Sequence, residues 1–142
     1  MNLTEIKAEI DKAGVFGASI SNDAHETPKI HARLIWLRTQ EKGVLQALER
    51  DLECLYRDRW LVYSGKATPE QLKTERFASL RILKTDLDIF LEADDILQKQ
   101  VSAIEVAKQK IALLEEGIKM CNQRPFLLKT MLDARKFEAG LN

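Results

Sequence analysis

The chain has 142 residues, of which 22 are basic and 22 acidic, so its formal net charge at pH 7 is zero. Hydrophobic residues make up 45% of it and aromatic residues 6%, with only 6 glycines and 3 prolines. This length suits one domain, and so few chain breakers are typical of a mostly helical protein. Because nucleic-acid-binding proteins are usually basic overall, any such binding here must depend on a local patch of charge.

The cysteines, the apolar runs and the N-terminus exclude further classes of protein. Cys54 and Cys121 stand far apart with no CxxC pair, so we expect two reduced cysteines and neither a disulfide framework nor a zinc site. No apolar run reaches the roughly 18 residues that a membrane span needs. The first residues lack the basic start and apolar core of a signal peptide, so we expect a cytoplasmic protein.

The N-terminal part predicts one short helix followed by a loop. Leu3, Ile6 and Ile10 share one helical stripe, which predicts a helix over residues 3–13. Residues 14–27 contain two glycines and several Ser, Asn and Asp residues, which is typical of a loop or linker.

A first long helix is predicted to begin at Thr27-Pro28. Threonine caps free backbone N–H groups, and proline is tolerated at the first helical position. The pattern runs to about Tyr63, and its apolar members recur at spacings near 3.5 residues, as in bundles and coiled coils. They are Leu34, Leu45, Leu48, Leu52, Leu55 and Val62. A helix this long spans roughly 50 Å at 1.5 Å per residue, so we expect a partner chain to cover part of it.

Thr68-Pro69 predicts a second helix start, in which Thr68 caps and Gln71 completes a capping box. An apolar stripe then extends the helix to Cys121, and residues 92–95 are the expected place for a bend. The stripe consists of Phe77, Leu80, Leu83, Leu87, Phe90, Leu97, Val101, Ile104, Ala107, Ile111, Leu114 and Ile118.

Residues 122–125 end with Pro125 and predict a break before a last amphipathic helix over 126–139, which Gly140 closes. This helix carries too many apolar groups for a free surface, so we expect a partner helix there. Those groups are Phe126, Leu127, Leu128, Met131, Leu132 and Phe137. No segment alternates like a strand. The predicted fold is therefore all-α: one helical domain over residues 1–142, built as an elongated bundle or long helical hairpin, with a short N-terminal helix and a C-terminal oligomerisation helix.

The zero net charge conceals segregated charge. Residues 57–84 hold seven basic and three acidic residues, a net of +4, whereas residues 85–98 hold five acidic residues and no basic one. Two solvated helix faces would explain this pattern equally well.

A functional interpretation centres on residues 57–66. Arg57 and Arg59 stand beside Trp60 and Tyr63, just before a Ser64-Gly65-Lys66 turn. Single-stranded nucleic acid binds to cations through its phosphates and to flat rings through its unstacked bases. Arg57 and Arg59 splay by roughly 200° on a helix of 3.6 residues per turn, so one could face DNA while the other braces a neighbouring subunit or the turn. Ordinary packing remains the alternative for the two rings.

Catalytic and metal-binding patterns are absent from the sequence. His25 and His31 are the only histidines, and no Glu precedes either by three positions as in di-iron bundles. Neither HExxH nor a Gly-rich phosphate loop occurs. Asp86, Asp88, Asp94 and Asp95 lack the spacing of a calcium loop. We therefore expect no enzyme, no catalytic or metal-binding residues, and no cofactor.

Four segments, in order along the chain, carry a resemblance to a known family. The stretch RDRWLVYSGK over residues 57–66 is similar to the basic box of the UvsY recombination mediators of tailed bacteriophages, in which two basic positions precede Tyr-Ser-Gly and a further basic residue. The ending DARKFEAG over residues 133–140 resembles that family's chain ending. Val15-Phe16, and Arg124 with Phe126, fall where the family has a Val-Phe pair and a short Arg-x-Phe break.

The resemblance implies a recombination mediator of phage homologous recombination, replication and repair, acting in the host cell cytoplasm. Such proteins form homo-oligomeric rings of six or seven subunits, bind single-stranded DNA, and promote loading of a RecA-like recombinase onto DNA covered by single-stranded DNA-binding protein. Two basic positions of the family's box match Arg57 and Arg59, with Arg57 in place of the family's lysine. The family's assembly helix maps onto residues 126–139. Trp60-Leu61-Val62 and Pro125 depart from the family's pattern.

The resulting candidate DNA-binding residues are Arg57, Arg59, Tyr63, Lys66, Lys73 and Arg76. The rival hypothesis is a structural or adaptor coiled-coil oligomer that does not bind nucleic acid, which the neutral charge and long heptad-like helix also permit. A metal-dependent helical bundle comes third. A salt titration of binding to an oligonucleotide separates the first two, since only the mediator should show steep salt dependence and prefer single strands.

Overall fold

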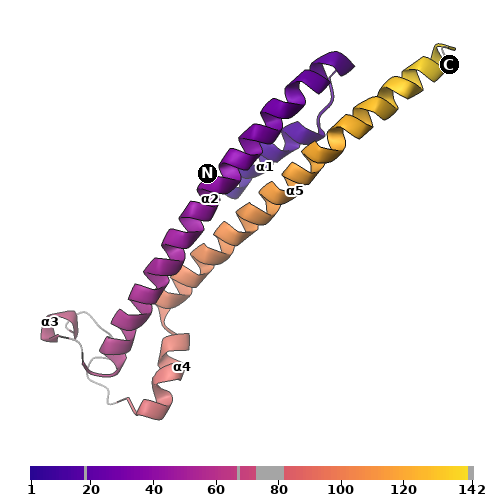
Figure 1. Ribbon diagram of the computed structural model, residues 1–142. Helices are drawn as coiled ribbons and strands as arrows, with labels where there is room; N and C mark the ends of the chain where they lie inside the picture. Colours follow the sequence, from indigo (N-terminus) through magenta and orange to yellow (C-terminus); the bar gives the residue numbers. More distant parts are fainter. Residues whose placement is uncertain (18, 67, 73–81, 141–142) are drawn as a thin grey trace. The chain divides into compact units, whose positions relative to one another are not determined.

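The computed structural model describes residues 1–17, 19–66, 68–72 and 82–140, and within these ranges every regular element is a helix. The elements are α1 (Leu3–Gly14), α2 (Ile20–Tyr63), α3 (Pro69–Leu72), the 3₁₀ helix η1 (Lys84–Asp86), α4 (Leu87–Glu92) and α5 (Asp95–Glu138) (Figure 1). The predicted all-α fold is confirmed. The chain divides into two compact units: unit 1, Met1–Gly43 with Lys108–Asn142, and unit 2, Val44–Ala107.

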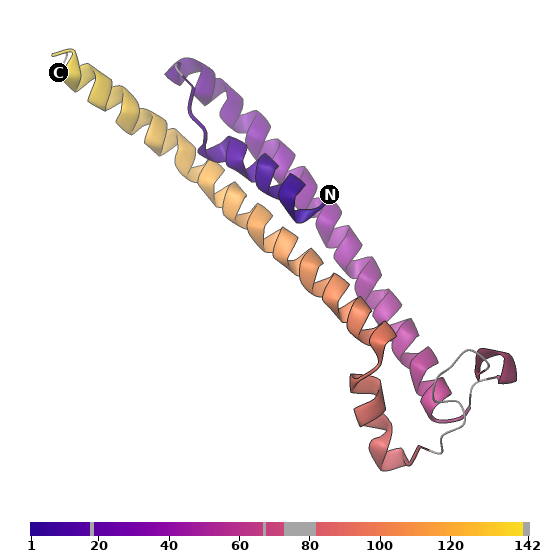
Figure 2. The same ribbon diagram turned by 180° about the vertical axis from the view of Figure 1, so that it is seen from behind.

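Unit 1 is a three-helix assembly in which α1 lies alongside the first part of α2 and the last part of α5 (Figures 1 and 2). Ile6, Leu34 and Leu114, one from each helix, are fully buried at its centre. Gly117 lets the helices approach closely, because an added Cβ would lie 3.0 Å from Ile10 Cγ1 and 3.2 Å from Leu34 Cδ1. Burial of such side chains against one another is the main stabilising contribution to this unit.

Unit 2 joins the last part of α2, the short helices and the first part of α5. Its buried cluster consists of Tyr63 from α2, Leu87 and Leu91 from α4, and Leu97 from α5. The apolar side of α4 therefore packs against both long helices within this unit.

Several predicted boundaries are confirmed. α1 begins after Asn2, whose side chain forms a capping box with Glu5, and α2 ends at Tyr63. α3 begins at Pro69, and the expected bend at residues 92–95 is the junction between α4 and α5. Gly140 follows α5 at a φ of 74°, in the left-handed region that glycine adopts without strain.

The predicted start of the first long helix at Thr27-Pro28 is wrong, and the predicted loop over residues 14–27 is confirmed only at residues 15–17 and 19. α2 begins at Ile20, and Pro28 lies inside it. Ser19 provides the start, because its Oγ accepts from the Asn22 N–H at 3.2 Å and its carbonyl accepts from the Asp23 N–H at 3.0 Å.

The predicted break at residues 122–125 is also wrong, because α5 runs through Pro125 to Glu138 without a separate last helix. Proline inside a helix costs about 3 kcal/mol. In both long helices the residue before the proline makes a buried tertiary contact: Arg124 Nε donates to Thr27 Oγ1 at 2.9 Å. Tertiary contacts thus outweigh the local signal at both prolines.

Arg124 is the centre of a buried network that we call the Arg124 clamp. Its guanidinium donates to the carbonyls of Ala13 at 2.9 Å and Val15 at 2.8 Å, and lies 4.7 Å from the centroid of the Phe16 ring. Its NH2 also lies 3.7 Å from the Asp23 carboxylate. The clamp satisfies carbonyls that the end of α1 leaves without helical partners.

The predicted continuous helix from residue 68 to Cys121 is wrong at residues 82–94. Residues 82–83 are not helical, and two short helices, η1 and α4, precede α5. Phe77 and Leu80 lie outside the described residues. Both cysteines are free thiols, Cys54 exposed and Cys121 buried, and burial raises the pKa of the Cys121 thiol. Among the described helices, none combines the length and the apolar character that crossing a membrane requires.

Candidate nucleic-acid interface

The turn after α2 has a defined backbone geometry. Gly65 lies at a φ of 75°, its N–H donates to the Val62 carbonyl at 3.1 Å, and the Lys66 N–H donates to the Leu61 carbonyl at 2.9 Å. This is a Schellman motif, which requires a residue that tolerates the left-handed conformation. The Ser-Gly pair of the basic box therefore ends the helix at a fixed point and places Lys66 directly after it.

Arg57 and Lys66 are the exposed cations of the box. The Arg57 side chain is 70% exposed, and its partner among the described residues is the neighbouring Asp58 at 3.4 Å. Such a surface ion pair contributes little, so it leaves the guanidinium available to a phosphate. Lys66 is exposed, with its ammonium group 4.9 Å from the centroid of the half-buried Trp60 ring.

Arg59 and Tyr63 have a different environment, because both are buried against Asp94 at the start of α5. Arg59 Nε donates to Asp94 Oδ2 at 2.8 Å, and the Tyr63 hydroxyl donates to the same oxygen at 2.5 Å. The Arg59 side chain is only 9% exposed and that of Asp94 only 2%. Arg57 and Arg59 thus point apart as their spacing predicts, one to solvent and one into the unit.

Asp94 also caps α5, since its Oδ1 accepts from the Leu97 N–H at 2.9 Å. Burial alone would raise the pKa of Asp94, but the hydrogen bonds from Tyr63, the Leu97 N–H and Arg59 outweigh burial and lower it. Burial, followed by the bond to Asp94, raises the pKa of Tyr63. The carboxylate is therefore held ionised and the phenol protonated. In the sequence alone, nothing distinguishes Asp94 from the other acidic residues of its segment.

The remaining candidates fall in two groups. Lys73 and Arg76 lie outside the described residues. At the end of α5, Phe126, Leu127, Leu132 and Phe137 are exposed, Met131 is half-buried and Leu128 is buried. Four of the six residues expected to assemble subunits therefore expose apolar side chains at the end of α5, in unit 1, with Phe126 74% and Phe137 73% exposed.

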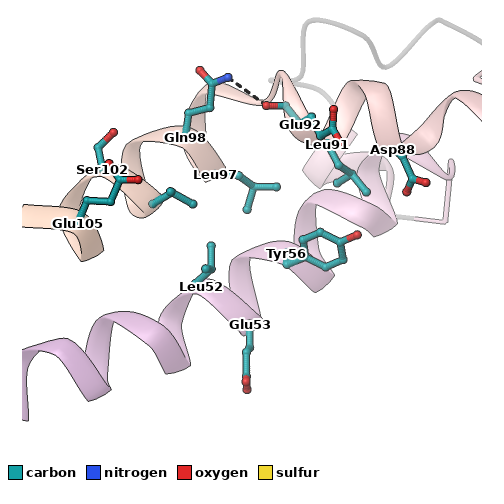
Figure 3. A pocket seen from close by; sticks show the side chains of 11 residues that line it. Leu52, Glu53, Tyr56, Asp88, Leu91, Glu92, Leu97, Gln98, Ser102 and Glu105 are labelled. Carbon is teal, nitrogen blue, oxygen red and sulfur yellow. Dashed lines mark hydrogen bonds between the residues drawn. The ribbon is translucent and has the colours of Figure 1, made fainter. Parts of the chain in front are cut away.

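A groove of about 890 Å³ lies elsewhere on unit 2, between α2, α4 and α5. Leu52, Leu91 and Leu97 point toward one another at its floor (Figure 3). Its rim carries four carboxylates and no basic residue: Glu53, Asp88, Glu92 and Glu105. Negative charge of this kind repels phosphate, so the groove is no surface for nucleic acid. In the described part of the chain, no group of three or more His, Cys, Asp or Glu residues could hold a metal ion.

These features define an all-α protein with a cationic helix end and an exposed apolar helix surface. A family model described as "Recombination, repair and ssDNA binding protein UvsY" matches residues 6–141. The chain belongs to the UvsY family. The predicted membership is thus confirmed, and with it the association with recombination, repair and single-stranded DNA binding. No curated protein matches the chain.

The fold is also similar to crystal structures of the bacteriophage T4 recombination mediator protein UvsY. Its lattice type II structure is 18% identical, with a TM-score of 0.79 and 98% of each chain covered. Its lattice type IV structure is 17% identical, with a TM-score of 0.80, covering 96% of this chain and 99% of that one. At this identity the likeness shows a shared fold.

Proposed function

We propose that the chain is a recombination mediator that binds single-stranded DNA as a homo-oligomeric ring and promotes loading of a RecA-like recombinase onto DNA covered by single-stranded DNA-binding protein. The observation that carries the DNA-binding part is the pair of exposed cations, Arg57 and Lys66, held at the rigid end of α2. The recombinase and the single-stranded DNA-binding protein are proposed as partners from the resemblance to the family.

Within the predicted DNA-binding set, we assign direct phosphate contact to Arg57 and Lys66. Arg59 and Tyr63 are buried, so we assign them to the support of this surface rather than to contact with bases or phosphates. Lys73 and Arg76 remain predicted contacts.

The ring is proposed from the exposed apolar surface at the end of α5. Large exposed apolar patches are typical of protein–protein interfaces. Two phosphate contacts from one subunit bind weakly, whereas a ring repeats them at high effective concentration. A protomer of zero net charge would then bind single-stranded DNA tightly.

The test is a salt titration of binding to a labelled single-stranded oligonucleotide. Arg57→Ala combined with Lys66→Ala should weaken binding and reduce the slope of log K against log salt by about 0.7 for each lost contact. Arg50→Ala combined with Lys99→Ala is the matched control, because it removes two exposed cations from the same unit. The proposal is contradicted if both double variants bind the oligonucleotide with the same affinity and salt slope. It is also contradicted if the unchanged protein does not bind single strands at low salt, which is the result expected of an adaptor protein.

A further inference from the structure

We infer that Asp94 is a positioning residue of the DNA-binding surface, which through Arg59 and Tyr63 holds the last turn of α2 and thereby sets where Arg57 and Lys66 meet phosphate. This inference rests on the proposed single-stranded DNA binding. It assigns a role to an acidic residue outside the basic box, 35 residues from Arg59 and 31 from Tyr63.

One carboxylate joins two helices at this point. Asp94 Oδ2 accepts from Arg59 and Tyr63 on α2, while its Oδ1 accepts from the Leu97 N–H of α5. Arg59 and Tyr63 are four residues apart, so they lie on the same helix face one turn from each other. Their guanidinium and ring also stack, with Arg59 Cζ 5.3 Å from the Tyr63 ring centroid. Both the rotation and the end of α2 are therefore tied to the start of α5.

The exposed cations depend on this anchoring. Arg57 lies on the same final turns of α2 but points away from Asp94, and Lys66 follows Tyr63 by three residues through a hydrogen-bonded turn. A shift of the last helical turn would therefore move both cations together. Charged hydrogen bonds to a buried carboxylate are among the stronger contacts available for such an anchor.

A purely electrostatic effect of Asp94 on DNA binding would be opposite in direction to a positioning effect, so the direction of the change in affinity distinguishes the two. A negative charge near a phosphate site repels the phosphate, so its removal should strengthen binding. The same outcome would follow if Asp94 merely competed with phosphate for Arg59. A positioning role instead predicts that removing the charge weakens binding.

The experiment is a salt titration of single-stranded DNA binding by Asp94→Asn in the full chain. Asparagine keeps the size of the side chain and an oxygen that can cap α5. We expect affinity at low salt to fall about tenfold, with a shallower salt slope because fewer phosphates are contacted. If Asp94→Asn only reduced the fraction of folded protein, affinity would fall by the same factor at every salt concentration. That result would contradict a positioning role.

Asp95→Asn is the matched control, since Asp95 is the exposed neighbour and loses the same charge. It should bind as tightly as the unchanged protein, or slightly more tightly. Combining Arg59→Ala with Asp94→Asn should weaken binding by less than the sum of the two single losses in free energy, because Arg59 is one of the two side chains through which Asp94 acts. Additive losses, or equal losses in Asp94→Asn and Asp95→Asn, would overturn the inference.

Tyr63→Phe covers the case in which Asp94→Asn does not fold, because it removes only the hydroxyl that bonds to Asp94. A two- to threefold loss of affinity is expected. Binding by Asp94→Asn or Tyr63→Phe that equals or exceeds that of the unchanged protein would overturn the inference while leaving the proposed function intact. Failure of the unchanged protein to bind would instead overturn the proposed function.

Discussion

Arg59 and Arg124 are buried arginines that each connect segments distant in the chain. Arg59 bonds to Asp94 at 2.8 Å within unit 2, and Arg124 bonds to Thr27, Ala13 and Val15 within unit 1. Buried charges persist in proteins only when ion pairs and hydrogen bonds satisfy them. Arginine therefore has two roles in this chain: Arg59 and Arg124 connect distant segments in the interior, whereas Arg57 is exposed to solvent.

Removal of Arg124 should be among the most damaging single changes outside the apolar core. Arg124→Ala leaves Asp23 buried without its ion pair and the end of α1 without its donor. We expect the free energy of unfolding to fall by about 3–5 kcal/mol, the range for breaking a buried ion pair. Urea denaturation measures this loss, with exposed Arg135→Ala as the control, and a loss below about 1 kcal/mol would show that the clamp is not stabilising.

For single residues, the sequence predicts the direction of a side chain on its helix better than the burial and the partners of that side chain. The opposite directions of Arg57 and Arg59 follow from helix geometry alone and are confirmed. The burial of Arg124 could not be predicted, because its partners lie 97 to 111 residues away. Asp94 was indistinguishable from neighbouring acids for the same reason.

At the scale of elements, local signals were reliable where no tertiary contact opposed them. The end of α2 at Ser64-Gly65 and the start of α3 at Pro69 depend on backbone chemistry within a few residues, and both were predicted. Thr27-Pro28 and Pro125 carry equally clear local signals, yet helices α2 and α5 continue through them. There the buried bond between Thr27 and Arg124 holds the two helices together.

Because α5 is continuous, Pro125 lies inside a helix, and we predict that it lowers the stability of the protein. Pro125→Ala restores the N–H that would bond to the Cys121 carbonyl, and should stabilise the protein by about 2 kcal/mol after the entropy that proline removes from the unfolded chain is subtracted.

The matched control for this prediction is Pro69→Ala. Pro69 occupies the first position of α3, where proline is well tolerated, so its replacement should change the free energy of unfolding little. Thermal unfolding of both variants checks this comparison. If Pro125→Ala unfolds at a lower temperature than the unchanged protein, α5 is not continuous at that point.

At the scale of the whole molecule, the central feature is the combination of zero net charge with a local cationic surface. The all-α fold and family membership could both be predicted from the sequence, because helical periodicity and the short motifs survive in one chain. The division into two units could not, since it depends on which distant segments pack together.

Assembly is the step that should turn this local surface into tight binding. Phe126→Ser with Phe137→Ser removes two of the most exposed apolar side chains and should reduce particle mass, measured by light scattering. Val15→Ser with Leu83→Ser is the matched control, because these side chains are also well exposed but lie outside the last part of α5. The control should keep the mass of the unchanged protein.

The most direct measurement is the salt slope of single-stranded DNA binding by the unchanged protein and by the Phe126→Ser, Phe137→Ser variant. One subunit gives a slope of about 1.4 in magnitude from Arg57 and Lys66, and of about 2.8 if Lys73 and Arg76 also contact phosphate. We predict a slope steeper than about 2.8 for the assembled protein and a fall into the range of about 1.4 to 2.8 in the variant. A slope of about 2.8 or less in the assembled protein, or the same slope in both, would contradict binding through repeated copies of one cationic surface.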